Sequence, residues 1–140
     1  MSVLSFACAI LAGSIVSTHA ADPLPEALTK LIDNSRVETG DVGKVLADPM
    51  QLAISDISGK VSSPEGDRED VSVTSSRHDP NYILIDVQRT RFADDSQEGL
   101  RRFWISQGLD DGKFKVIAQG IQIRCWRGQN KMVWQTKNCP

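Results

Sequence analysis

The hydrophobic positions of this chain change their spacing twice along the sequence. An apolar run over residues 3–16 comes first, interrupted only by small residues. A helical spacing follows, in which the apolar residues fall at i, i+4, i+7 and i+8. These residues are Leu24, Leu28, Leu31 and Ile32. In the second half, apolar and polar residues alternate, which is typical of strands with one buried face. The order of the patterns predicts helices followed by strands.

The helical spacing predicts a helix over Glu26–Ser35. Pro25 suits the first turn, where no N–H is needed, and Glu26 complements the helix dipole. The segment lacks the basic polar face that membrane-surface helices use. We therefore expect its apolar stripe to pack against the sheet.

Residues 39–63 permit two interpretations. Asp48-Pro49 suits the N-cap and first position of a second helix. The apolar face of that helix would consist of Met50, Ile54 and Ile57. Leu52 and Ile54 fit a short strand equally well. The pattern leaves the choice between helix and strand open here.

Alternation predicts five strands in the second half, joined by short polar turns. They are Val71–Thr74, Tyr82–Phe92, Leu100–Gln107, Lys113–Trp126 and Lys131–Thr136. In the second of these strands we expect Ile83, Ile85 and Val87 to share one face. In the third, Phe103 and Ile105 should point inward.

The fourth strand contains a shift of phase. Its apolar residues are Phe114, Val116 and Ala118 before the shift, and Ile121, Ile123 and Cys125 after it. The two sets have opposite parity, and a β-bulge near Gly120 would place all six on the same side of the sheet. Bulges also bend a sheet, so we expect this one to be curved.

These elements predict an α+β domain with one hydrophobic core over residues 21–140. One N-terminal helix, or two, would pack on a curved antiparallel sheet of about five strands. The broad outline would be that of cystatin-like or NTF2-like folds. A small antiparallel barrel capped by a helix is the alternative.

The first twenty residues have the pattern of a cleaved secretory signal peptide. Small residues follow the apolar run, with Thr18 and Ala20 at positions −3 and −1 of a cleavage site. The run is shorter than the roughly 20 apolar residues that span a bilayer, so we expect no transmembrane segment. No Lys or Arg precedes the run, which leaves a buried N-terminal helix as the alternative. The pattern predicts a periplasmic or secreted protein.

Cleavage would leave two cysteines, Cys125 and Cys139, and one histidine, His78. A cysteine pair in a small exported domain predicts a disulfide. Metal sites built from several histidines and cysteines need more ligands than this chain contains, so we expect no metal and no cofactor. His78 lies in a turn-like segment without an identifiable catalytic partner. We therefore favour a protein that is not an enzyme.

Charge is distributed unevenly between the two halves. Residues 1–80 hold six Lys and Arg against twelve Asp and Glu, whereas residues 81–140 hold ten against six. Export argues against nucleic acid as the partner of the basic half. A protein or an anionic component of the cell envelope fits the predicted compartment.

The C-terminal region carries the most distinctive pattern of the chain. Three tryptophans and three arginines suggest a binding face, because both residue types are enriched at interface hot spots. They are Trp104, Trp126, Trp134, Arg102, Arg124 and Arg127. A straight final strand would carry Cys139 far from Cys125, so we expect residues 137–140 to fold back across the sheet.

The segment Arg124–Gly128, followed by Trp134 and Cys139, has the form Arg-Cys-x-x-Gly, then Trp, then Cys. This ending resembles the C-terminal tails of small uncharacterised exported proteins of Gram-negative bacteria. The resemblance covers only about the last twenty residues. It implies export and a disulfide, and no known activity.

Three functions follow from these observations. The first is an exported, non-catalytic binding protein, such as a periplasmic inhibitor, an immunity-type protein or an envelope accessory factor, that uses the Trp/Arg face. The second is an NTF2-like ligand carrier or small enzyme with a pocket between helix and sheet. Its polar groups would be Tyr82, Asp86, Arg89 and His78. The third is a structural envelope component. The pattern leaves the oligomeric state open.

Overall fold

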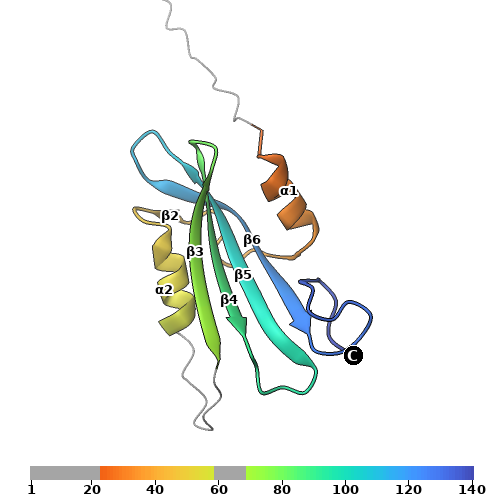
Figure 1. Cartoon of the computed structure of the whole chain (residues 1–140). Coiled ribbons are helices and arrows are strands. Elements are labelled where there is room, and N and C mark those ends of the chain that lie inside the picture. The colour runs from red at the N-terminus through yellow and green to blue at the C-terminus, as the bar shows by residue number, and fades with distance from the viewer. Residues whose placement is uncertain (1–22, 59–68) are drawn as a thin grey trace, which may run out of the picture.

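A computed structural model describes residues 23–58 and 69–140 of the chain (Figure 1). The predicted signal peptide, residues 1–20, lies outside the described residues. Within them the chain forms two helices, α1 and α2, and one antiparallel sheet. The α+β prediction is therefore confirmed in its coarse form.

The sheet contains six strands in the described part of the chain. They are β1 (Arg36–Glu38), β2 (Val45–Leu46), β3 (Asp70–His78), β4 (Tyr82–Thr90), β5 (Gln97–Gly108) and β6 (Phe114–Cys125). Their order is β1-β6-β5-β4-β3, and β2 pairs with β6 beyond the end of β1. Among these strands β3 and β1 form open edges, so the alternative of a closed barrel is wrong.

Helix α1 (Glu26–Asp33) lies on one face of the sheet. Leu28 is buried, and Leu24, Leu31 and Ile32 surround it against the sheet. The ring of Phe103 fits against β6 because Gly120 has no side chain there. A Cβ atom at Gly120 would lie 2.5 Å from Cζ of Phe103.

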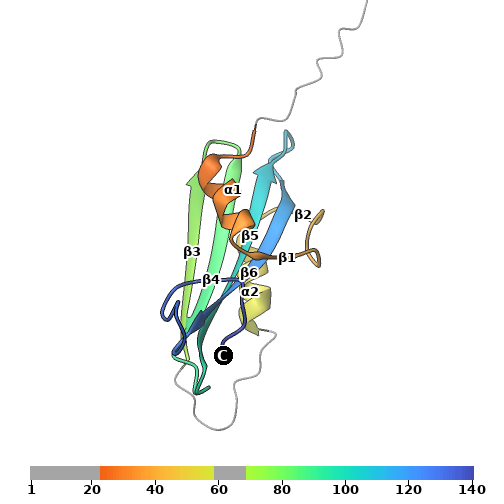
Figure 2. The same cartoon turned by 90° about the vertical axis from the view of Figure 1, so that its right-hand side faces the viewer.

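Helix α2 (Met50–Ser58) covers the opposite face of the sheet (Figures 1 and 2). The helix interpretation of this segment is confirmed. Asp48 caps the helix as predicted, because its carboxylate accepts a hydrogen bond from the Met50 N–H at 2.9 Å.

Of the predicted apolar face, Met50 does pack toward the sheet, but Ile54 and Ile57 are exposed. The buried residues of the helix are Leu52 and Ala53. The inward side of α2 also carries the charged Asp56. The apolar residues alone therefore do not mark this side of the helix in the sequence.

The sheet therefore separates two hydrophobic clusters, and the expectation of one core is wrong. Ile83, Ile85 and Val87 share the face that packs on α2. Phe103 and Ile105 point to the α1 side. Both of these strand predictions are confirmed.

The phase shift in β6 is real, but it lies before Gly120. Ile105 pairs with Ala118 and the next residue, Ser106, pairs with Val116. Ile117 is therefore the extra residue, and it lies with Ala118 on the α1 side. The prediction that Ala118 shares a face with Val116 is wrong.

The chain after β6 forms turns in place of the predicted strand Lys131–Thr136. Gln135 makes a single bridge to Ile123 of β6. Met132 adopts a φ of 61°, in the left-handed region, which an extended strand does not use. The strand Val71–Thr74, by contrast, is longer than predicted and extends over all of β3.

Candidate functional site

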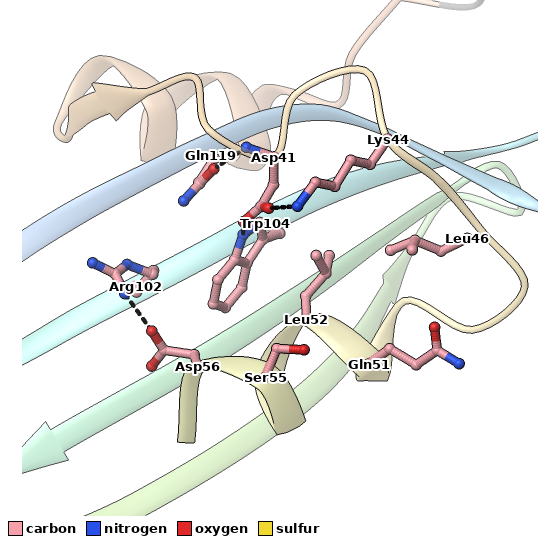
Figure 3. Close-up of a pocket in the computed structure, with 10 residues that line it drawn as sticks. All are labelled: Asp41, Lys44, Leu46, Gln51, Leu52, Ser55, Asp56, Arg102, Trp104 and Gln119. Carbon is pink, nitrogen blue, oxygen red and sulfur yellow. Dashed lines mark hydrogen bonds and ion pairs between the residues drawn. The ribbon is translucent and has the colours of Figure 1, made fainter. Parts of the chain in front are cut away.

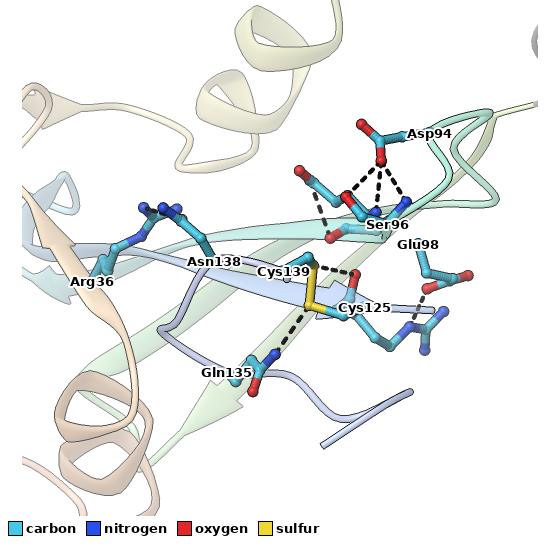
Figure 4. The surroundings of a disulfide bond; sticks show 11 residues. Arg36, Asp94, Ser96, Glu98, Cys125, Gln135, Asn138 and Cys139 are labelled. Carbon is cyan, nitrogen blue, oxygen red and sulfur yellow. Dashed lines mark hydrogen bonds and ion pairs between the residues drawn. A yellow bond between two sulfur atoms is a disulfide. The ribbon is translucent and has the colours of Figure 1, made fainter. Parts of the chain in front are cut away.

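The predicted disulfide joins Cys125, at the end of β6, to Cys139 (Figure 4). The two Cα atoms are 5.5 Å apart, so the last residues do fold back, as expected. The Gln135 amide donates a hydrogen bond to Sγ of Cys125 at 3.0 Å. Arg36 of β1 donates another to the side chain of Asn138 at 3.3 Å. These contacts hold the tail against the sheet.

The tail exposes apolar and basic side chains together. We call this group the C-terminal surface; it consists of Trp126, Arg127, Lys131, Met132, Val133 and Lys137, all of which are exposed. Residues 126–140 contain no Asp or Glu. Trp126 is 42% exposed, and its backbone N–H donates to the carbonyl of Ser96 at 2.9 Å. A cavity of about 320 Å³ lies beside these residues, between Arg127 and Lys137.

The loop between β4 and β5 borders the C-terminal surface and supplies an acid that contacts it. Asp95 lies 3.8 Å from Arg127, and both side chains are largely exposed. Asp94 accepts hydrogen bonds from the backbone N–H groups of Gln97 and Ser96, which lower the pKa of its carboxyl. Arg127 is therefore accessible despite its contact with Asp95.

The other Trp and Arg residues of the predicted face are distributed over both sides of the sheet. Arg124 stacks over Trp134, 4.8 Å from the ring centroid, and pairs with the buried Glu98. Trp104 is 2% exposed and lies under α2, on the same side as Arg102. Because neighbouring strand residues point to opposite faces, these six residues do not form one surface. Only Trp126 and Arg127 of the six belong to the C-terminal surface.

A second cavity of about 320 Å³ lies between α2, the loop before β2, and the sheet (Figure 3). Its apolar wall is formed by Leu46, Leu52 and Trp104. Its polar wall contains Asp41, Lys44, Gln51, Ser55, Asp56, Arg102 and Gln119. The predicted pocket between helix and sheet thus has a counterpart, but under α2.

The charges that line this cavity are paired with one another. Asp41 accepts hydrogen bonds from Nζ of Lys44 and from Nε1 of Trp104, the latter at 2.9 Å. Burial works to raise the pKa of the Asp41 carboxyl, but these two hydrogen bonds and the charges of Lys44 and Arg102 together place the pKa below its ordinary value. Asp41 is therefore ionised at neutral pH.

Asp56 forms the centre of an ion cluster at the floor of the cavity. Its carboxylate is 6% exposed and pairs with Arg102 from β5 and with Arg89 from β4. Each arginine has a further acidic partner, Glu38 for Arg102 at 3.3 Å and Glu69 for Arg89 at 3.2 Å. The cluster alternates positive and negative charges, so the cavity carries little net charge.

The four polar residues predicted to share a pocket lie apart. Asp86 binds Arg101 on the α1 side, with Nε of Arg101 2.9 Å from its carboxylate. Arg89 lies on the α2 side, Tyr82 is buried in the α1 cluster, and His78 contacts Ser76 at the end of β3. Alternation along β4 places Arg89 on the side opposite Tyr82 and Asp86, and His78 belongs to a different strand.

Sequence reasoning did not find Asp41, Lys44 or Asp56 as cavity residues. Asp41 and Trp104 are joined across 63 positions, and no local pattern links them. Arg102, which the sequence did single out, reaches the cavity only because α2 folds back over β5.

Residues 23–58 and 69–140 show neither a metal-ligand cluster nor a membrane-spanning helix. No group of three or more His, Cys, Asp or Glu side chains is arranged to hold a metal ion there. No helix in that part is long and apolar enough to cross a membrane. Comparison of the chain with models of protein families, with curated proteins and with solved structures found no match.

Proposed function

We propose that this is an exported, non-catalytic binding protein that recognises an acidic protein partner through its C-terminal surface. The observation that carries the proposal is the composition of that surface. Exposed Trp126, Met132 and Val133 lie among three cations in a segment without acidic residues. Large aromatic and arginine side chains contribute most of the energy in many protein interfaces.

The covalent structure of the tail supports a role in recognition. The Cys125–Cys139 bond, the bridge from Gln135 to Ile123 and the Arg36–Asn138 contact order a segment without regular secondary structure. A surface that is already ordered loses less conformational entropy on binding. Its positive charge would steer an acidic partner toward it.

We also propose that the protein is exported and that its sheet has a cystatin-like or NTF2-like outline. Export is supported by the apolar run, by the small residues that follow it, by the cysteine pair and by the resemblance of the tail to exported proteins. A curved, cystatin-like or NTF2-like sheet is supported by α1 on one face and by the irregular pairing at Glu98 and Ile117. Periplasmic inhibitors, immunity-type proteins and envelope accessory factors are the functional types that this combination suits.

The direct test is capture of partners by residues 21–140 with an N-terminal tag and the disulfide intact. Wild type is compared with Trp126→Ala and with Arg127→Ala in envelope extracts, and captured proteins are identified and assayed in purified form. We expect each variant to weaken binding at least tenfold, and added salt to weaken binding of the wild type. Capture that is equal for all three proteins would show that the C-terminal surface is not the binding site.

Matched controls lie at the opposite end of the sheet. Leu109→Ala removes an apolar side chain that is 37% exposed, and Lys113→Ala removes an exposed cation. Both should bind as wild type does. An anionic polymer as the true partner would give a different result: Arg127→Ala would lose binding to a sulfated polysaccharide while Trp126→Ala kept it.

A small-ligand carrier is the second candidate, and the α2 cavity is the observation that favours it. Its volume is at the lower end of the range for ligand pockets. Ser55→Phe would fill the cavity and abolish the rise in melting temperature that a small polar ligand produces. Trp126→Ala would leave that rise unchanged, which separates the two candidates.

A further inference from the structure

Strand β3 is an edge of the sheet that neither helix covers. Eight of its nine residues are exposed, whereas most of the neighbouring β4 is buried. Figure 2 shows β3 at the outer margin, beside β4. No described residue pairs with the outer side of β3, because the order of strands ends there.

This edge lacks the features that usually prevent strands from pairing between molecules. Proteins protect edges with proline, lysine, bulges or charges in the middle of the strand. The register between β3 and β4 is regular over all nine pairs, from Asp70–Thr90 to His78–Tyr82. The central residues 71–76 are Val-Ser-Val-Thr-Ser-Ser, without charge and without proline. A long, regular and uncharged edge is suited to pairing with another strand.

The ends of β3 carry opposite charges. Asp70 stands at the start, and Arg77 stands one residue before the finish. Asp70 pairs with Arg91, but both side chains are about 60% exposed and remain accessible. In an antiparallel arrangement of two identical strands, the acidic end of each would lie beside the basic end of the other.

We infer that β3 pairs with β3 of a second copy of this chain, antiparallel and centred on Thr74. This register places Asp70 opposite His78 and Ser72 opposite Ser76, while Thr74 lies opposite its own counterpart. The two sheets join into one continuous antiparallel sheet around a twofold axis, which is the usual symmetry of a dimer. Small hydroxyl and valine side chains at the centre suit cross-strand packing.

Pairing through β3 also determines where the two C-terminal surfaces of a dimer lie. That surface lies near the end of the molecule where β3 begins, beside the ends of β4 and β6 (Figure 1). Antiparallel pairing places the two C-terminal surfaces of a dimer at opposite ends of the joined sheet. The inference about β3 does not depend on what the C-terminal surface binds.

Mass measurement across a concentration series tests the dimer. Residues 21–140 with the disulfide intact are analysed by sedimentation equilibrium from low micromolar to high micromolar concentration. We expect the wild type to shift from monomer to dimer. Thr74→Lys and Thr74→Glu should each weaken dimer formation at least tenfold, because like charges then face each other across the axis.

The register is tested by mixing the two variants. A mixture of Thr74→Lys and Thr74→Glu should recover a dimer, since opposite charges then meet at the axis. Recovery also shows that both variants are folded, and circular dichroism checks each alone. Thr29→Lys, on the exposed side of α1, is the matched control and should dimerise as wild type does.

Three results would overturn the inference. The first is a wild type that stays monomeric at all concentrations, as expected if β3 pairs with a different protein. The second is a dimer that withstands both charged substitutions. The third is a mixture of folded variants that shows no recovery, because the strands then pair in another register or not at all.

Discussion

The two faces of the sheet are formed by the same strands, but their interiors are packed differently. On the α1 side, Leu28, Phe103 and Ile105 form an apolar cluster with large, fully buried side chains. On the α2 side, Trp104 and Leu52 share the space with a buried ion cluster and a cavity. The α1 side is therefore a packed core that also holds the Asp86–Arg101 pair, whereas the α2 side combines packing with a larger ion cluster and a cavity.

Loss of an apolar side chain on the α1 side should have the largest effect. Phe103→Ala removes a fully buried ring and should lower the free energy of unfolding by about 3–5 kcal/mol. Urea denaturation at pH 7 measures this change.

The contact between Phe103 and Gly120 provides a second test of the packing on the α1 side. Gly120→Ala should cost about 1–3 kcal/mol in the wild type, because the new Cβ meets the ring. In the Phe103→Ala background that cost should nearly vanish. An equal cost in both backgrounds would show that the ring is not the obstacle.

Loss of charge on the α2 side should have an intermediate effect. Asp56→Asn weakens the hydrogen bonds to Arg89 and Arg102 and should cost about 1.5–3 kcal/mol. Glu26→Gln breaks an exposed pair with Lys30 and serves as the control, with a change within about 0.5 kcal/mol. A cost for Asp56→Asn above that of Phe103→Ala would reverse the comparison between the two faces.

Asp41 gives the α2 side a small dependence on pH. Burial raises its pKa, but the hydrogen bonds from Lys44 and Trp104 and the charges of Lys44 and Arg102 together place the pKa below the ordinary value. Asp41 therefore stabilises the fold above its unfolded pKa and loses this contribution as the pH falls through its folded pKa. The stability difference between wild type and Asp41→Asn should shrink from about pH 5 to about pH 2. A difference that grew on acidification would contradict the sign of the shift.

The outer side of α2 should show the smallest effect. Ile54 is 58% exposed, so Ile54→Ala should change the free energy of unfolding by no more than about 0.5 kcal/mol. Leu52→Ala, two residues earlier on the inner side, should cost about 2–5 kcal/mol. Similar costs at both positions would mean that the helix presents a different side to the sheet.

Local patterns predicted the elements better than they predicted the site. Sequence patterns predicted the apolar stripe of α1, the inward orientation of Phe103 and Ile105, the phase shift in β6 and the cysteine pair. They did not predict the inner side of α2, because it includes Asp56, whose partners come from β4 and β5. The prediction of a final strand over Lys131–Thr136 was wrong for a similar reason. The backbone at Met132 and the disulfide turn the chain back, whereas the local alternation predicted an extended strand.

The sequence by itself determined the coarse α+β class, the order of the long strands β3 to β6 and the pairing of Cys125 with Cys139. These follow from periodicity and residue counts, which are properties of neighbouring positions. Tertiary structure alone decided which charges meet in the α2 cavity, and that Trp104 is buried while Trp126 is exposed. The physical reason is that strand register and helix placement bring together residues far apart in sequence, and local spacing carries no information about those pairs.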